Sequence, residues 1–131
     1  MLTDVQSLIF SALLTWVMLI TASFLRHRLW TPAGMKIGVG NRDDVPEPTP
    51  LAARADRAAK NMLESLLLFV CVVVAARYAG APSDQLTLGT TLFFWARLAY
   101  FGVYLAGIPY LRTAIWIVAV LGVFIIARAA L

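Results

Sequence analysis

Charged residues are scarce in this chain of 131 residues. Only 14% of the residues are Asp, Glu, Lys or Arg, whereas about a quarter of the residues of a soluble domain are charged. Hydrophobic residues make up 61% of the sequence, and the mean hydropathy is +0.81. This balance argues against a soluble fold, and the length fits one domain. The composition therefore predicts an integral membrane protein that contacts a lipid bilayer and is held together by helix packing and internal polar contacts.

Cysteine and histidine are nearly absent from the sequence. Cys71 is the one cysteine, so no internal disulfide can form, and its apolar neighbours predict a small buried hydrophobic residue. His27 is the one histidine and lies between two arginines. The sequence contains no zinc-ligand spacing, Gly-rich phosphate loop or Ser-His-Asp set. We therefore expect no metal site.

Long apolar runs predict four membrane-spanning helices, at about residues 5–26, 51–78, 86–106 and 111–130. The connection at residues 27–50 is rich in Gly, Pro, Asn and Asp and is predicted to be a loop. It contains Gly34-x-x-x-Gly38, which lies outside any apolar run and is therefore not interpreted as a helix-dimerisation motif. The other two connections are short turns. The predicted fold class is all-α, with a single domain forming a four-helix up-and-down transmembrane bundle.

The basic residues indicate an orientation rather than a nucleic-acid partner. The net charge is +4, but the basic residues are scattered among apolar segments, so we expect no nucleic-acid binding. Most of them belong to the end of the bundle shared by the first and third connections: Arg26, Arg28, Lys36, Arg42, Arg54, Arg57 and Arg112. Only Arg77 and Arg128 belong to the opposite end. The positive-inside rule therefore predicts that the crowded end faces the cytoplasm, with both termini on the other side.

A polar stripe runs into the second apolar segment without an intervening turn residue. Arg54, Arg57, Asn61 and Glu64 lie within roughly 80° of one helix face, and Lys60 is beside them. Glu64 lies about one turn inside the apolar part, where an ionised group is costly. An ion pair between Glu64 and Arg97 of the third segment would offset this cost, and that structural interpretation stays open.

Further polar residues share the same end of the bundle. Arg97, Tyr100 and Tyr104 lie within about 60° of each other on the third helix, and Arg112 and Thr113 begin the fourth. One ion pair does not require this many cations and tyrosines. Arginine clamps carboxylates through two hydrogen bonds, and Asn, Glu and Tyr recognise amide and amine groups. The set therefore suits a small anionic ligand with several carboxylate and peptide groups.

These two patterns resemble a known family. Arg54-x-x-Arg57-Ala-x-x-Asn61-x-x-Glu64 is similar to the second-helix signature of the MAPEG proteins (membrane-associated proteins in eicosanoid and glutathione metabolism). Arg97-x-x-Tyr100-x-x-x-Tyr104, followed by Arg112-Thr113, resembles the third helix of that family and the start of its fourth. The length, the four predicted spans and the long first connection also agree, so the resemblance covers nearly the whole chain.

The resemblance implies a homotrimer that binds glutathione, as a co-substrate, between adjacent subunits. Carried over by position, the second helix would hold the peptide and its carboxylates through Arg57, Lys60, Asn61 and Glu64. The implied pocket is completed by Arg97, Tyr100, Tyr104 and Thr113, and the residue implied to stabilise the thiolate, and so to be catalytic, is Arg112. The chain departs from the family pattern in three ways. Family members often have a proline shortly after the glutamate, whereas none lies close after Glu64 here. Lys60 stands where some members have an arginine, and Tyr100 replaces a histidine found in some members.

The resemblance favours a membrane glutathione transferase-like protein of bacterial type, in the inner membrane if the source is bacterial. It would conjugate or reduce a small hydrophobic electrophile that arrives from the bilayer. The alternative is a non-catalytic membrane protein of the same fold, whose polar stripe serves only oligomer assembly. A small transporter is disfavoured because no inverted repeat or broken helix is apparent.

Overall fold

Threonine residues cap the N-terminal ends of the first three helices in the computed structural model, which describes residues 1–131. The helices are α1 (Asp4–His27), α2 (Pro32–Val39), α3 (Pro50–Tyr78), α4 (Ser83–Ala106) and α5 (Pro109–Ala130). The Thr3 hydroxyl accepts a hydrogen bond from Gln6 N at 3.1 Å, and the Gln6 side chain accepts one from Thr3 N at 3.0 Å. Thr31 and Thr49 cap α2 and α3 in a similar way. Each cap satisfies backbone N–H groups that a helix start leaves free.

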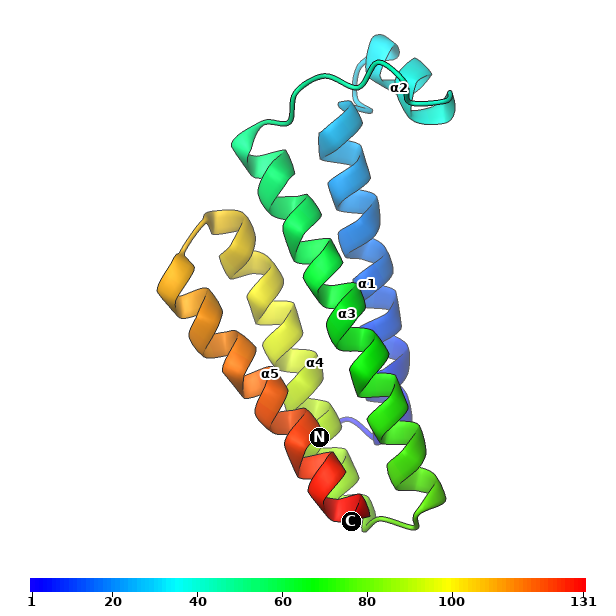
Figure 1. Cartoon of the computed structure of the whole chain (residues 1–131), viewed down its shortest axis with the longest axis vertical. Helices are drawn as coiled ribbons and strands as arrows, with labels where there is room; N and C mark the ends of the chain where they lie inside the picture. The colour runs from blue at the N-terminus through cyan, green and yellow to red at the C-terminus, as the bar shows by residue number, and fades with distance from the viewer.

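The four long helices form an up-and-down bundle (Figure 1). α1 and α4 run toward the end that carries α2, and α3 and α5 run away from it. Both termini and the α3–α4 turn lie at the opposite end. α3 is the longest helix, with 29 residues, and its first turns extend past the α4–α5 turn (Figure 1). It also runs unbroken through Glu64.

All four long helices are long and apolar enough to cross a membrane. Each contains an 18-residue segment with a high mean hydropathy: 2.2 in α1, 1.8 in α3, 1.2 in α4 and 2.2 in α5. The all-helical class and the four candidate membrane spans are thereby confirmed. The prediction for Cys71 is wrong, because this cysteine is exposed on the surface of the chain. A membrane helix can direct apolar residues toward lipid as well as toward the core, so apolar neighbours do not predict burial.

Small residues allow the helices to approach each other closely. On α3, Ala55, Ala58 and Ala59 are buried, and α3 packs against α1 and α4. α4 and α5 meet at two glycines: a Cβ atom on Gly89 would lie 2.6 Å from the carbonyl oxygen of Gly122, and the reverse holds for a Cβ atom on Gly122. Small residues at such crossings are typical of membrane helix bundles.

An aromatic pair fills the core where α3 meets α4. The rings of Phe69 and Phe93 stack with their centroids 3.9 Å apart, and both residues are buried. These contacts fix α4 against α3, and α3 and α4 carry most of the polar residues singled out in the sequence.

The predicted loop at residues 27–50 contains a helix that the sequence did not indicate. α2 begins after the Thr31 cap with Pro32 at its first position, a residue already suited to a helix start. A Cβ atom on Gly34 would overlap the backbone carbonyl oxygens of His27 and Arg28. The glycine that counted as a helix breaker therefore allows α2 to pack directly on the end of α1.

Candidate functional site

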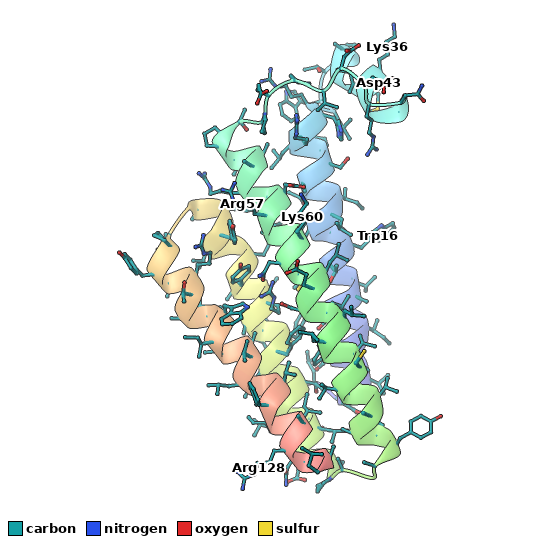
Figure 2. The ribbon with its side chains drawn as sticks, in the orientation of Figure 1. Trp16, Lys36, Asp43, Arg57, Lys60 and Arg128 are labelled. Atoms are coloured by element: carbon teal, nitrogen blue, oxygen red, sulfur yellow. The ribbon has the colours of Figure 1, made fainter.

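Seven polar residues line a cavity of about 310 Å³ near the α2 end of the bundle, which we call the polar cavity. They come from α3, α4 and α5: Arg57, Lys60, Asn61, Glu64, Tyr100, Tyr104 and Arg112. Figure 2 shows Arg57 and Lys60 on α3 near the level of the α4–α5 turn, and Arg128 at the other end of the bundle. Helices α3, α4 and α5 thus bring together residues separated by as many as 55 positions, from Arg57 to Arg112.

Tyr104 is placed between two arginines. Nε of Arg57 donates a hydrogen bond to the Tyr104 hydroxyl at 3.2 Å, and the guanidinium of Arg112 lies 4.7 Å from the centre of its ring. The Tyr104 ring also meets the Tyr100 ring edge to face, with centroids 5.4 Å apart. Because its oxygen accepts from Arg57, the Tyr104 hydroxyl keeps its own proton free to donate to a ligand.

The charges around the polar cavity favour an anion. Arg57, Lys60 and Arg112 are cationic and Glu64 is the one carboxylate in the lining. Lys60 also pairs with Asp56 at 3.0 Å, but both side chains are largely exposed, so water screens this pair and leaves it weak. Arginine and lysine side chains that converge on one cavity can bind several carboxylate groups.

Arg97 does not line the polar cavity, although the sequence grouped it with the ligand-binding residues. Its side chain is fully buried and donates to Asn61 Oδ1 at 2.9 Å and to Met62 Sδ at 3.2 Å. The ion pair between Glu64 and Arg97, which the sequence left open as a structural alternative, is absent from the chain, where the ion pairs are Lys60–Asp56 and Arg77–Asp4. The reason is the stagger of α3 against α4, which brings Asn61, one turn before Glu64, to the level of Arg97.

Arg54, the first residue of the predicted stripe, has a structural contact. Its Nε donates to the carbonyl oxygen of Leu105 at 3.2 Å, in the last turn of α4. A cation at this position satisfies a free carbonyl group and interacts favourably with the helix dipole. The Arg54 side chain therefore links the start of α3 to the end of α4 through this hydrogen bond.

A second, smaller pocket adjoins the polar cavity. It has a volume of about 180 Å³ and is lined by Asn61, Tyr100, Arg112, Thr113 and Trp116. Thr113 thus lies beside the other predicted residues, although outside the polar cavity itself, and its hydroxyl donates to Pro109 O at 3.2 Å.

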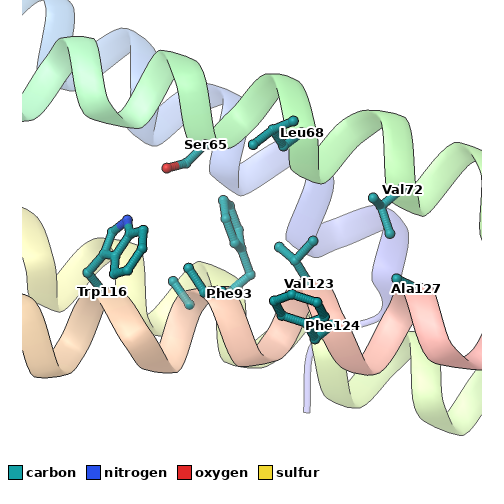
Figure 3. Close-up of a pocket in the computed structure, with 10 residues that line it drawn as sticks. Ser65, Leu68, Val72, Phe93, Trp116, Val123, Phe124 and Ala127 are labelled. Atoms are coloured by element: carbon teal, nitrogen blue, oxygen red, sulfur yellow. The ribbon is translucent and has the colours of Figure 1, made fainter.

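Trp116 also begins an apolar groove of about 310 Å³ between α3 and α5. Figure 3 shows Trp116 at one end, with Phe93 behind and Leu68, Val72, Val123, Phe124 and Ala127 along its length. Ser65 is the one polar residue in its lining. The groove and the smaller pocket share Trp116, and the smaller pocket shares Asn61, Tyr100 and Arg112 with the polar cavity. A polar binding region and an apolar one are therefore adjacent.

Sequence reasoning missed Trp116 and Met62. Trp116 follows Arg112 by four residues and so lies on the same face of α5, which is a signal that the sequence did contain. Met62 gives no such signal, because its sulfur atom becomes an acceptor only through the placement of Arg97 on the neighbouring helix. No group of His, Cys, Asp and Glu side chains comes together that could hold a metal ion.

A family model described as the MAPEG family matches residues 5–131, which is essentially the whole chain. The chain belongs to the MAPEG family. This confirms the resemblance drawn from the polar patterns on the second and third predicted helices. With its four apolar helices, this MAPEG protein is an integral, multi-pass membrane protein, and the family generally uses glutathione. A search of curated proteins finds no match.

Proposed function

We propose that this MAPEG protein is a membrane glutathione transferase-like enzyme that conjugates or reduces hydrophobic electrophiles with glutathione. The observation that carries the proposal is the adjacency of the cationic polar cavity to the apolar groove through Trp116. An enzyme that joins a charged peptide to an apolar molecule needs both kinds of surface within reach of one reacting atom.

The charges of glutathione complement those of the polar cavity. With its thiol ionised, glutathione carries two carboxylates, one thiolate and one ammonium group, and the cavity presents three cations and one carboxylate. In this proposal Arg57, Lys60 and Asn61 bind the carboxylates and peptide groups, and Glu64 binds the ammonium group. Tyr100, Tyr104 and Thr113 complete the wall around the peptide.

Arg112 is the proposed catalytic residue. It is the one cation of the polar cavity that also lines the smaller pocket, where Trp116 marks the junction with the apolar groove. Its positive charge would favour the thiolate, which attacks an electrophilic carbon atom held in the groove. A carbon–sulfur bond forms, the bond to the leaving group breaks, and the thiol proton is released to solvent. Fixed positive charge beside a reacting anion is a large source of catalysis.

Two further features of the proposal concern assembly and orientation. We infer a homotrimer in which a neighbouring subunit closes the polar cavity, because Glu64 is exposed in the single chain and has no ion-pair partner there. An exposed carboxylate at this depth in a membrane is costly without a partner. The positive-inside rule supports an orientation in which the polar cavity opens toward the cytoplasm.

Binding and turnover of glutathione by the purified protein test the proposal. We expect calorimetric titration with millimolar glutathione to give saturable binding, and conjugation of chlorodinitrobenzene with release of chloride. Arg57→Ala should weaken binding, whereas Arg42→Ala should not, because Arg42 lies outside the polar cavity and bonds only to Gly38 O.

A folded oligomer that binds no glutathione at millimolar concentration would contradict the proposal. The assembly-only alternative makes a different prediction: Arg57→Ala and Glu64→Ala would dissociate the oligomer, and no ligand would restore it. Size-exclusion chromatography coupled to light scattering separates the two outcomes.

A further inference from the structure

Arg97 contacts two residues of α3 and one of α4 from a fully buried position. It donates from Nη2 to Asn61 Oδ1 at 2.9 Å and from Nε to Met62 Sδ at 3.2 Å. The carbon atom of its guanidinium lies 4.1 Å from the centre of the Tyr100 ring. Arg97 itself lines neither the polar cavity nor the smaller pocket, whereas Asn61 and Tyr100 line both. Its influence on a ligand would therefore pass through these two residues.

The donor chemistry of arginine fixes the orientation of the Asn61 amide. A guanidinium has only donors and stays charged, so the Asn61 atom that it meets must be the oxygen. The other polar atom of the side chain, Nδ2, has no hydrogen-bond partner among the side-chain hydrogen bonds of the chain. Since Asn61 lines the cavity, the group that it can offer there is an amide NH2.

We propose that Arg97 is a positioning residue, which holds Asn61 so that its Nδ2 donates to an acceptor oxygen of the glutathione peptide. This inference rests on the proposed function for the identity of the ligand. The Tyr100 ring, packed against the same guanidinium, is held in place as well. Without Arg97 the amide can turn over, and an Asn61 oxygen directed toward an anionic ligand would repel it.

A double-mutant cycle on glutathione affinity tests the inference. The four proteins are wild type, Arg97→Met, Asn61→Ala and the double variant, and the dissociation constant of glutathione is measured by calorimetry in one detergent. Methionine fills a similar volume with apolar atoms, so it leaves no buried charge unpaired. We expect each single variant to bind about tenfold more weakly, the effect of one hydrogen bond to a charged or polar ligand group. The double variant should bind no more weakly than Asn61→Ala.

Additive losses would overturn the inference, because Arg97 would then act on the ligand independently of Asn61. Unchanged affinity in Arg97→Met would overturn it as well. The KM for the electrophile is a second readout: a positioning role predicts that Arg97→Met raises the KM for glutathione and leaves the KM for chlorodinitrobenzene unchanged. A general loss of structure would change both.

Asn61→Asp keeps the inference testable if Arg97→Met does not fold. An aspartate can still accept from Arg97, and it would replace the donor NH2 with a second acceptor oxygen. We expect this variant to assemble normally and to bind glutathione more weakly than Asn61→Ala does, because its oxygen repels the ligand acceptor. Affinity equal to that of wild type would overturn the inference. If the wild-type protein does not bind glutathione, the proposed function is refuted and this inference with it. If the wild-type protein binds glutathione but the losses in the double-mutant cycle are additive, only this inference is refuted.

Discussion

Replacing Arg112 with alanine removes the one cation that lines both the polar cavity and the smaller pocket, which shares Trp116 with the apolar groove. A unit charge about 4 Å from a thiolate contributes about 4 kcal/mol at an effective dielectric constant near 20. Arg112 is only partly buried, so solvent reduces this contribution. We therefore expect a loss near the lower end of the range for a single electrostatic contact to a reacting anion, about 2.7 kcal/mol or a hundredfold in kcat.

Two assays measure this loss independently. The glutathione thiolate absorbs in the near ultraviolet, so a titration of the complex reports how far the protein lowers the pKa of the bound thiol. Stopped-flow conjugation of chlorodinitrobenzene reports the rate of attack. We expect Arg112→Ala to lose both the thiolate signal at neutral pH and the rate, while Arg112→Lys keeps part of each because it retains the charge without the planar fork.

Arg128→Ala is the matched control. Arg128 is also on α5 but at the opposite end of the bundle, where it lines none of the three regions described above (Figure 2). It should match wild type in both assays. A thiolate signal that survives in Arg112→Ala, with a rate within about threefold of wild type, would refute the role given to Arg112, because the loss would be well below the range for such a contact.

Three other substitutions test the groove, the core and the α2 contact. Trp116→Ala should raise the KM for an apolar electrophile about tenfold through lost apolar burial and leave glutathione affinity unchanged in calorimetry; equal effects on both would contradict separate regions. Gly89→Ala should destabilise the bundle by about 1–3 kcal/mol in thermal unfolding, because its Cβ atom would lie 2.6 Å from Gly122 O. Gly102→Ala is the control: its Cβ atom would meet no atom within 4 Å, so the stability should not change. Gly34→Ala should displace α2 from α1 and speed proteolysis of residues 28–49, and unchanged cleavage would contradict the packing of α2 on α1.

Apolar runs indicate membrane helices strongly because a backbone in lipid must satisfy its own hydrogen bonds. For this reason the sequence alone could predict the all-helical class and the four candidate spans. α2 could not be predicted in the same way, because its glycines and prolines are typical of a loop. Its helix depends on the Thr31 cap and on close packing of Gly34 against the end of α1, and that contact exists only once α1 has formed.

Helical periodicity explains why so many of the predicted polar residues line one cavity. A spacing of three or four residues places side chains on one face, so Arg57, Asn61 and Glu64 had to lie together on α3. The register between helices is not encoded in that spacing. The register determines that Arg97 meets Asn61 and Met62 rather than Glu64. It also leaves Arg97 buried and outside the lining of the polar cavity.

A structure of the protein with glutathione bound tests the central claim most directly. We expect glutathione to occupy the polar cavity, with its carboxylates near Arg57, its ammonium group near Glu64, and its sulfur atom beside Arg112 at the Trp116 junction. The Asn61 amide should donate to the peptide while its oxygen remains on Arg97. Glutathione bound elsewhere on the oligomer, or a polar cavity left empty at saturating concentration, would contradict the account.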